Sequence, residues 1–435
     1  MNNGNSIRRI LVDGKNLALR QGTGVATYAR SLCLNLTATK RRVELLYGEK
    51  LPSAASSAAN VSSTLNALRS DAAMVASHVT RRVTRFSRLF GAITPQRIDV
   101  DFLDRDGRFQ SNAQLTDRIW NISDGFDTPA LAVRAGKFQN VRNVMEADAA
   151  HWTYPLPVRL EGVPNIYTLH DLVPLILPQT TLDDKKFYYA LIKRIVETAD
   201  LIVTVSHQSK IDIHSMFNVP DSRVINTYQD VEIPPSMLFS SEESVENAVR
   251  QVSGLEVGRY ILFYGAIEPK KNVGRLIEAY LSSDIGIPLV IAGKDGWMVE
   301  EELRLYTEHV DQPRGTQRII RLPYVPRHQL VHLVRGARAV AFPSLYEGFG
   351  LPLAEAMLCG TPLITSNMGA MKEIAGDAAL LVDPYDVGSI REGLKRITRE
   401  PTLRKELSAA GLERVSAFSS SNYRQRLAGA YSCIV

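Results

Sequence analysis

The feature that most constrains the fold is an alternation of short apolar runs with helical segments, which occurs twice along the chain. In the first half, runs rich in Val, Ile and Leu are separated by amphipathic stretches such as Phe187 to Glu197. The strands predicted there are Arg8 to Asp13, Val43 to Tyr47, Ile166 to Leu169, Leu201 to Val205 and Val224 to Asn226. Strands alternating with helices in this way form a parallel sheet covered on both faces.

The alternation restarts after an acidic, serine-containing stretch at residues 240–246. The strands predicted in the second half are Tyr260 to Tyr264, Leu289 to Ala292, Ile319 to Leu322, Ala339 to Phe342, Pro362 to Thr365 and Leu380 to Val382. We therefore predict two α/β domains, 1–240 and 256–415, joined near residues 232–256. Ligands of open parallel sheets bind beyond the carboxyl ends of the strands, so the site is expected between the domains.

Residues 49–140 do not follow the alternation and are interpreted as an insertion. Within them, apolar residues from Leu65 to Phe90 recur every three or four positions, as on one face of a helix, and five arginines lie mostly off that face. Such a helix could lie on an anionic membrane surface. Packing against the N-terminal domain with solvated arginines is the interpretation favoured by base rates.

The insertion also contains two D-x-D pairs, Asp99 with Asp101 and Asp104 with Asp106. Paired carboxylates could hold a divalent cation. A polar turn ending at Gly107 explains them adequately, and we predict no metal site.

Composition excludes several classes of protein. The chain has 435 residues, 45% hydrophobic and 22% charged, which is ordinary for a globular protein with two or more cores. A net charge of +5 is too small to indicate a nucleic-acid partner. The 3 cysteines lie far apart, so neither a disulfide framework nor a zinc site is indicated. Without a membrane-length apolar run or a signal peptide, a cytoplasmic location is expected.

The stretch from Glu347 to Glu355, Glu-Gly-Phe-Gly-Leu-Pro-Leu-Ala-Glu, is the most informative motif for function. Gly348 and Gly350 allow a tight turn and close approach to a ligand, and Pro352 suits the first turn of a helix. Two carboxylates beside a bound phosphate are unfavourable unless each accepts hydrogen bonds, for example from a sugar diol. Nucleotide sugars have hydroxyls at both ends and a diphosphate between them.

At the predicted start of this helix, the backbone N–H groups of Phe349, Gly350 and Leu351 would point outward. Such N–H groups form an anion site at a helix N-terminus. The motif therefore predicts a phosphate there.

Residues 342–357, Phe-Pro-Ser-Leu-Tyr-Glu-Gly-Phe-Gly-Leu-Pro-Leu-Ala-Glu-Ala-Met, resemble the E-x7-E signature of retaining glycosyltransferases of family four. The resemblance continues through Cys359-Gly-Thr-Pro and Glu373-Ile-Ala-Gly-Asp-Ala-Ala-Leu-Leu-Val-Asp-Pro, and back to Tyr260-Ile-Leu-Phe-Tyr-Gly-Ala-Ile-Glu-Pro-Lys-Lys-Asn. It implies an α/β GT-B fold, with two Rossmann-like domains facing a central cleft. It also implies that the last helix, within 416–435, crosses back to the N-terminal domain.

The resemblance suggests roles for individual residues. Lys271 occupies the position of a phosphate-binding lysine, where a positive charge stabilises the departing diphosphate. Many members have an arginine after the preceding strand's glycine. This chain has Gly265-Ala266 there, so Lys270 could supply the second charge. Two solvated lysines at a turn are the alternative.

Two further positions match in the N-terminal half. His170, in the His-Asp element ending the run Ile166-Tyr-Thr-Leu-His-Asp, is implied to contact the donor sugar near the reacting carbon. A histidine there could instead be a structural hydrogen-bonding residue. Gly24, in Gly22-Thr-Gly24 after the first strand, matches the glycine-rich loop near the diphosphate. Thr27 occupies the third glycine position of a dinucleotide fingerprint, which counts against NAD.

The resemblance therefore implies a retaining hexosyltransferase without a cofactor other than its nucleotide-sugar donor. In this interpretation Glu347 binds the hexose, Glu355 binds the ribose, and front-face departure needs no enzymic nucleophile. The closest pattern is that of bacterial O-antigen and exopolysaccharide mannosyltransferases, so GDP-mannose is the leading donor and a glycan or polyprenyl-diphosphate-linked glycan the acceptor. UDP-glucose, UDP-galactose and GDP-fucose remain alternatives, as do a GT-B phosphorylase, an epimerase and a non-catalytic scaffold.

Overall fold

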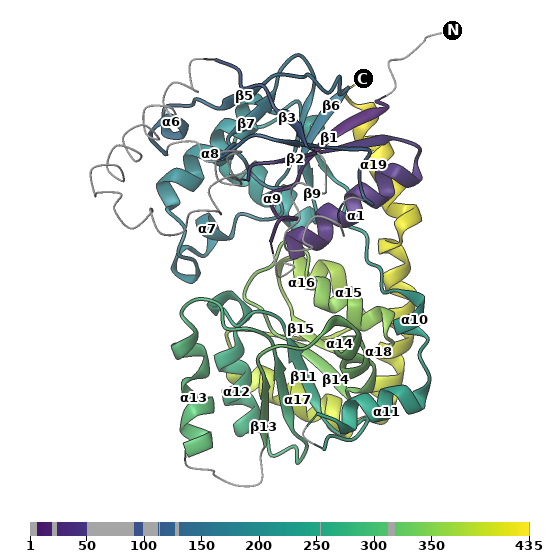
Figure 1. Ribbon diagram of the computed structural model, residues 1–435. Coiled ribbons are helices and arrows are strands. Elements are labelled where there is room, and N and C mark those ends of the chain that lie inside the picture. Colours follow the sequence, from purple (N-terminus) through teal and green to yellow (C-terminus); the bar gives the residue numbers. More distant parts are fainter. Residues whose placement is uncertain are drawn as a thin grey trace, which may run out of the picture.

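The computed structural model describes residues 7–19, 24–49, 91–98, 112, 114–126, 130–252, 254–311 and 318–434. Figure 1 shows two lobes, an upper one coloured purple to teal and a lower one that is mainly green. Each lobe is built on its own sheet, and helices pack around it. The two-sheet arrangement predicted from the alternating pattern is therefore confirmed.

The N-terminal sheet has the strand order β10-β9-β8-β6-β1-β2-β4-β3 within the described residues, and only the β3–β4 pair is antiparallel. Its strands are β1 (Arg9–Asp13), β2 (Arg42–Tyr47), β3 (Gln96–Ile98), β4 (Arg118–Asn121), β6 (Ala149–Trp152), β8 (Asn165–Thr168), β9 (Leu201–Thr204) and β10 (Val224–Asn226). A small parallel pair, β5 (Gln139–Val141) and β7 (Val158–Leu160), accompanies it.

Helices α8 and α9 of this lobe begin where the sequence provides a side-chain cap. The Asp184 side chain accepts a hydrogen bond from Phe187 N at the start of α8, and Ser206 accepts one from Ser209 N at the start of α9. The helices are α1 (Gly24–Ala38), α6 (Ala130–Arg134), α7 (Val173–Ile176), α8 (Lys185–Thr198) and α9 (His207–Met216).

The C-terminal sheet is parallel throughout, in the order β13-β12-β11-β14-β15-β16. Its strands are β11 (Ile261–Tyr264), β12 (Leu289–Ala292), β13 (Ile319–Leu322), β14 (Ala339–Phe342), β15 (Leu363–Ser366) and β16 (Leu380–Val382). All residues of β11, β12 and β14 are buried, which explains their unbroken apolar sequences. The predicted strands agree within one residue at either end.

The helices of the second half are α10 (Pro235–Leu238), α11 (Glu242–Arg250), α12 (Val273–Leu281), α13 (Val299–Asp311), α14 (Arg327–Gly336), α15 (Leu351–Leu358), α16 (Gly369–Ala375), α17 (Val387–Arg399), α18 (Pro401–Arg414) and α19 (Ser420–Ser432). Helices α12 to α17 alternate with the strands, as predicted, whereas α10 and α11 precede them and α18 and α19 follow. Helix α11 packs against α14 of the C-terminal lobe.

The last helix, α19, contacts the N-terminal lobe. It packs beside α1, where Figure 1 shows it in yellow. The Tyr431 hydroxyl lies 2.6 Å from His151 Nδ1, and the rings of Tyr423 and Tyr28 are 6.5 Å apart at their centroids. The C-terminal helix therefore joins the core of the first lobe.

Several sequence predictions lie outside the described residues. They are the amphipathic segment from Leu65 to Phe90, the residues Gly22 and Thr23, and both D-x-D pairs. The described parts of the insertion add β3 and β4 to the edge of the sheet, which the alternating pattern did not predict.

Candidate active site

The loop between β14 and α15 has the local structure that its glycines and proline predicted. Gly350 adopts a left-handed conformation at φ 89° immediately before α15, and Pro352 lies in the first turn. Among the described residues, no backbone hydrogen bond occupies the N–H groups of Phe349, Gly350 or Leu351. These three donors at a helix start form a favourable environment for an anion.

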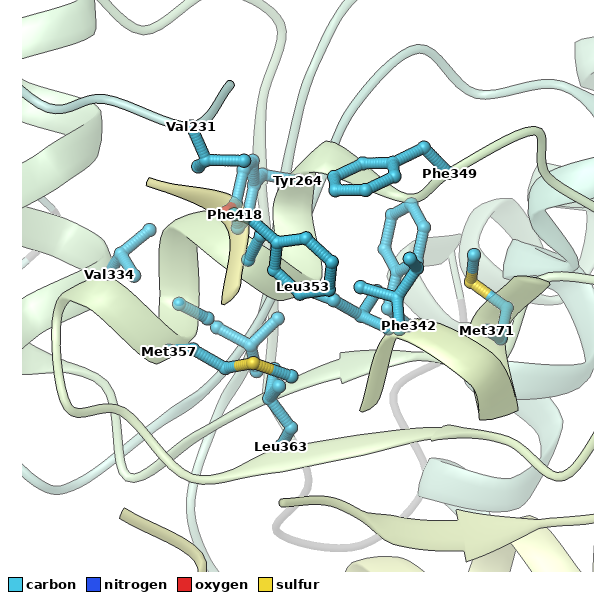
Figure 2. Packing of buried hydrophobic residues seen from close by; sticks show 14 of the residues in the cluster. Val231, Tyr264, Val334, Phe342, Phe349, Leu353, Met357, Leu363, Met371 and Phe418 are labelled. Atoms are coloured by element: carbon cyan, nitrogen blue, oxygen red, sulfur yellow. The ribbon is translucent and has the colours of Figure 1, made fainter. Parts of the chain in front are cut away.

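The side chain of Phe349 anchors this loop in the core. It is 4% exposed, and its ring lies 5.2 Å from that of Phe418 at the centroids. Figure 2 shows Phe349 and Phe418 close to Leu353 of α15. Only the backbone of Phe349 is therefore available to a ligand.

Glu347 is buried against positively charged side chains. Its Oε1 pairs with Lys271 Nζ and accepts a hydrogen bond of 3.2 Å from Ser344 Oγ, while its Oε2 lies 3.9 Å from Lys270 Nζ. Burial alone would raise the pKa of Glu347, but Lys271 and Lys270 hold this pKa below its ordinary value. The carboxylate is thus kept ionised inside the protein.

Lys270 and Lys271 lie in a turn that follows β11, Pro269–Lys271. Lys271 Nζ is 4.9 Å from the centroid of the Phe342 ring. Burial would lower the pKa of Lys270, but Glu347, Asp171 and Glu268 raise it well above its ordinary value. Both lysines therefore lie next to Glu347.

Asn272 holds this lysine turn against the Glu347 loop, a contact that sequence reasoning missed. Its side-chain amide donates to the carbonyl oxygens of Pro343 (2.9 Å) and Pro384 (2.7 Å). The residue has φ 62°, a conformation that asparagine tolerates better than most side chains. An asparagine directly after the lysine pair was the available signal.

His170 lies at the carboxyl end of β8, as predicted, and is partly buried. Its Nε2 is 2.9 Å from the carbonyl oxygen of Thr153, which can only accept, so Nε2 carries the hydrogen. The Tyr28 ring packs edge-on at 4.8 Å between centroids. Burial lowers the pKa of His170 and favours the neutral ring, whose lone pair is then on Nδ1.

The two lobes approach each other closely at Gly348. An ideal Cβ on Gly348 would lie 2.4 Å from the carbonyl oxygen of His170, so no larger residue fits without a backbone shift. The sequence suggested that this glycine allows approach to a ligand, whereas the structure places the other lobe there. A Cβ on Gly24 would be 3.8 Å from Leu351 Cδ1, so the start of α1 also lies near the start of α15.

Glu355 lies one turn into α15 and is already paired. Its Oε1 is 3.1 Å from Arg327 Nη1, and its Oε2 accepts a 3.3 Å hydrogen bond from the Tyr264 hydroxyl. The Arg327 side chain is 45% exposed. A ribose diol would therefore compete with a solvated arginine for this carboxylate, and no sequence pattern pointed to Arg327 as its partner.

Two further observations concern the described part of the chain. It contains no group of three or more His, Cys, Asp or Glu side chains arranged to hold a metal ion. None of its helices is long and apolar enough to cross a membrane.

Known proteins resemble this chain in both sequence and structure. The family profile described as "Glycosyl transferases group 1" matches residues 245–414. O-antigen chain mannosyltransferase B of Escherichia coli is 32% identical over 287 residues, which cover 64% of this chain and 72% of that protein. The serotype-specific mannosyltransferase WbdA of Escherichia coli is 28% identical over 279 residues, 62% of this chain, but this chain spans only 34% of that protein's length.

Among solved structures, Anabaena Alr3699/HepE in complex with UDP and glucose superimposes with a TM-score of 0.65 at 14% identity, over 98% of this chain and 99% of that one. This likeness and the two facing parallel sheets confirm the GT-B fold. The chain belongs to the glycosyl transferases of group 1, the family-four enzymes that its E-x7-E signature indicated, and it is a glycosyltransferase.

Proposed function

We propose that the protein transfers mannose from GDP-mannose to a hydroxyl of a glycan or lipid-linked acceptor, with retention of the anomeric configuration. Both reported E. coli relatives are named mannosyltransferases, which supports mannose as the sugar. The observation that carries the proposal is the ionised Glu347 held by Lys270 and Lys271. The unoccupied N–H groups from Phe349 to Leu351 supply the donors expected for a diphosphate.

In this proposal the residues act on different parts of the donor. Lys271, Lys270 and the N–H groups at the start of α15 neutralise the diphosphate as negative charge develops on it. Gly24 brings the start of α1 close to the same group. Glu347 accepts hydrogen bonds from hexose hydroxyls, and Glu355 accepts them from the ribose.

His170 would contact the sugar near its reacting carbon and help to orient it. The bond from the sugar to the phosphate breaks, and the acceptor hydroxyl attacks the same face through an oxocarbenium-like state. The departing phosphate takes the acceptor's proton, so no enzymic nucleophile is required. Contact between the lobes at Gly348 supports exclusion of water, which would hydrolyse the donor.

We also propose roles for the domains, the absence of a cofactor requirement, and a location for the protein. Residues 1–240 would form the acceptor domain and 256–415 the nucleotide-sugar domain, with 416–435 crossing back. No cofactor or metal would be needed beyond the donor. The site of action would be the cytoplasm, with peripheral contact to an anionic membrane.

The test is a screen of GDP-mannose, UDP-glucose, UDP-galactose and GDP-fucose with a lipid-linked glycan acceptor. Transfer is expected from GDP-mannose, at an undiminished rate in EDTA, and NMR of the product should show the donor's anomeric configuration. Inversion would exclude the proposed mechanism, and preference for another donor would replace GDP-mannose. An absolute Mn²⁺ requirement would overturn the metal-free assignment.

Replacing Glu355 by glutamine is expected to weaken binding of the free nucleoside diphosphate about tenfold, because a charged acceptor for the ribose diol is lost. Turnover at saturating donor should stay within about threefold of the wild type, since the reacting carbon is distant from the ribose. Calorimetric titration with GDP measures the first effect and initial rates the second. Unchanged GDP affinity would remove Glu355 from the ribose site.

A further inference from the structure

Helix α9 of the N-terminal lobe is held at its start by the C-terminal lobe. The Glu373 carboxylate, from α16, accepts hydrogen bonds from His207 N at 2.7 Å and Gln208 N at 2.9 Å. A carboxylate is favourable at a helix N-terminus, where unpaired N–H groups and the helix dipole attract negative charge. Each oxygen of Glu373 thus binds one of the first two residues of α9.

The next residue of α9 reaches the proposed sugar-binding loops. Ser209 Oγ donates to the carbonyl oxygen of His170 at 2.7 Å and lies 3.5 Å from that of Gly348. His170 belongs to the N-terminal lobe, whereas Gly348 directly follows Glu347 in the C-terminal lobe. One buried serine therefore contacts the backbone on both sides of the proposed reaction centre.

One turn further along α9, Asp212 binds the residue that directly precedes Glu347. The Tyr346 hydroxyl donates to Asp212 Oδ2, and Gln208 Nε2 donates to Asp212 Oδ1 at 2.8 Å. Burial raises the pKa of Tyr346, so its hydroxyl keeps the proton that it donates. Both oxygens of Asp212 are thereby fixed.

We propose that Tyr346 and Asp212 are positioning residues that fix the Glu347 loop relative to His170 from across the two lobes. The inference rests on the proposed transferase site. Within its own lobe, Glu347 is held by Lys271, Lys270 and Ser344, but those contacts do not set its separation from His170. The Tyr346–Asp212 hydrogen bond does, because Asp212 and His170 are joined through α9 and Ser209. Small displacements of groups that orient a reacting substrate strongly reduce the rate of the chemical step.

The kinetic test uses Tyr346→Phe, Asp212→Asn and the double variant, with Tyr189→Phe as a matched control. Tyr189 is 46% exposed on α8, and the described structure gives its hydroxyl no hydrogen bond. We expect kcat to fall about tenfold in each single variant, with the donor KM changed less than about twofold. The double variant should also lose about tenfold rather than a hundredfold, because both changes act on the same hydrogen bond: Asp212→Asn removes its charge and Tyr346→Phe its donor.

A structural role alone would lower the melting temperature and leave kcat of the folded enzyme unchanged, and that result would overturn the inference. Losses of kcat that multiply in the double variant would also overturn the inference. The same holds if the variants change only the donor KM, by increasing it.

A second measurement does not depend on the donor. Hydrogen exchange of the loop at residues 343–350 in the unliganded protein should accelerate in Tyr346→Phe and Asp212→Asn, and should not change in Tyr189→Phe. Unchanged exchange in Tyr346→Phe would overturn the inference whether or not the protein transfers mannose. Accelerated exchange combined with no transfer from any nucleotide sugar would retain the positioning contact and reject the proposed function.

Discussion

Replacing Glu347 by glutamine is expected to lower the transfer rate between about 100- and 1,000-fold while leaving the nucleotide able to bind. The carboxylate is proposed to accept hydroxyl hydrogen bonds that strengthen as positive charge develops on the sugar ring. Glutamine keeps the shape and removes the charge. Because the diphosphate is assigned to the lysines and the helix start, GDP affinity should not fall.

The same substitution should change stability in a ligand-dependent way. It leaves the largely shielded ammonium of Lys271 without its carboxylate, whereas Lys270 keeps Glu268 at 3.6 Å. Breaking a buried ion pair costs about 3–5 kcal/mol, which is the upper limit for this partly exposed one. Bound GDP restores negative charge beside Lys270 and Lys271, so GDP should raise the melting temperature more in the variant than in the wild type.

The measurements for this variant are initial rates, calorimetric titration with GDP, and thermal unfolding with and without GDP. Glu392→Gln on α17 is the matched control, because Glu392 pairs with Lys395 near the surface and away from the site. If Glu347→Gln retains more than about a tenth of wild-type turnover with its fold intact, the proposed role of Glu347 is wrong.

The C-terminal half was predictable because its strands β11, β12 and β14 are apolar on both faces. Runs such as Leu289 to Ala292 can be identified without knowing their neighbours, and the structure has the strand at those residues. Pro352 and Gly350 likewise specify the start of α15 through local conformation alone.

The N-terminal half was less predictable because several of its strands lack that signal, among them β6 and β4. Strand β6 lies between β1 and β8, yet its sequence is Ala-Ala-His-Trp, without a β-branched residue. Strand β4 starts with Arg118 and ends with Asn121, and it follows residues without a regular pattern. Both strands are stabilised by neighbours far away in the sequence, which local propensity does not record.

The candidate site also has features that the sequence predicts and features that it does not. The sequence singled out Glu347, Lys271 and His170 through short motifs that resemble those of the glycosyltransferase family, each placed after a recognisable strand. It did not predict that Arg327 pairs with Glu355 or that Glu373 caps α9, because both contacts depend on how separate elements meet. Residue type and spacing thus identified the chemical groups, whereas their partners required the folded chain.

The second large effect that we expect is a pH dependence of stability arising from His151. In the wild type it is masked by an opposite contribution from Asp13. The His151 side chain is fully buried between the Tyr431 hydroxyl at Nδ1 and the Thr168 hydroxyl at Nε2, at 2.6 and 2.7 Å. Burial lowers the pKa of His151 to about 3. Since the unfolded histidine has a pKa near 6.5, the stability due to the neutral ring is present above that pH and is lost as pH falls through about 3. The whole effect amounts to about 5 kcal/mol.

Asp13 opposes this trend over most of the same range. It is fully buried at the end of β1, where it accepts a hydrogen bond from Thr153 N, and burial raises the pKa of Asp13 to about 6. Its folded form therefore binds a proton more readily than the unfolded chain. The resulting stability is present below about pH 4 and is lost as pH rises through about 6, by about 3 kcal/mol.

Between about pH 4 and 6 the two contributions have opposite slopes, so the wild type should show little net change from these groups. The variants should separate them. Relative to the wild type, the stability of Asp13→Asn should rise by about 3 kcal/mol between pH 4 and 7.5. A pH-independent loss adds to this change, because one acceptor oxygen becomes an NH2 group facing Thr153 N or Lys15 N. His151→Gln should be less stable at pH 7.5 because it loses buried hydrogen bonds, and its deficit should shrink as the pH falls.

Urea unfolding of the three proteins at pH 7.5, 6, 5 and 4 measures these differences. All other titrating groups are common to the wild type and each variant, so each difference from the wild type isolates the substituted side chain. A stability difference for Asp13→Asn that does not depend on pH would mean that Asp13 titrates normally in the folded protein. A constant deficit for His151→Gln would mean that the ring becomes protonated without cost, which is incompatible with its burial between two hydroxyl groups.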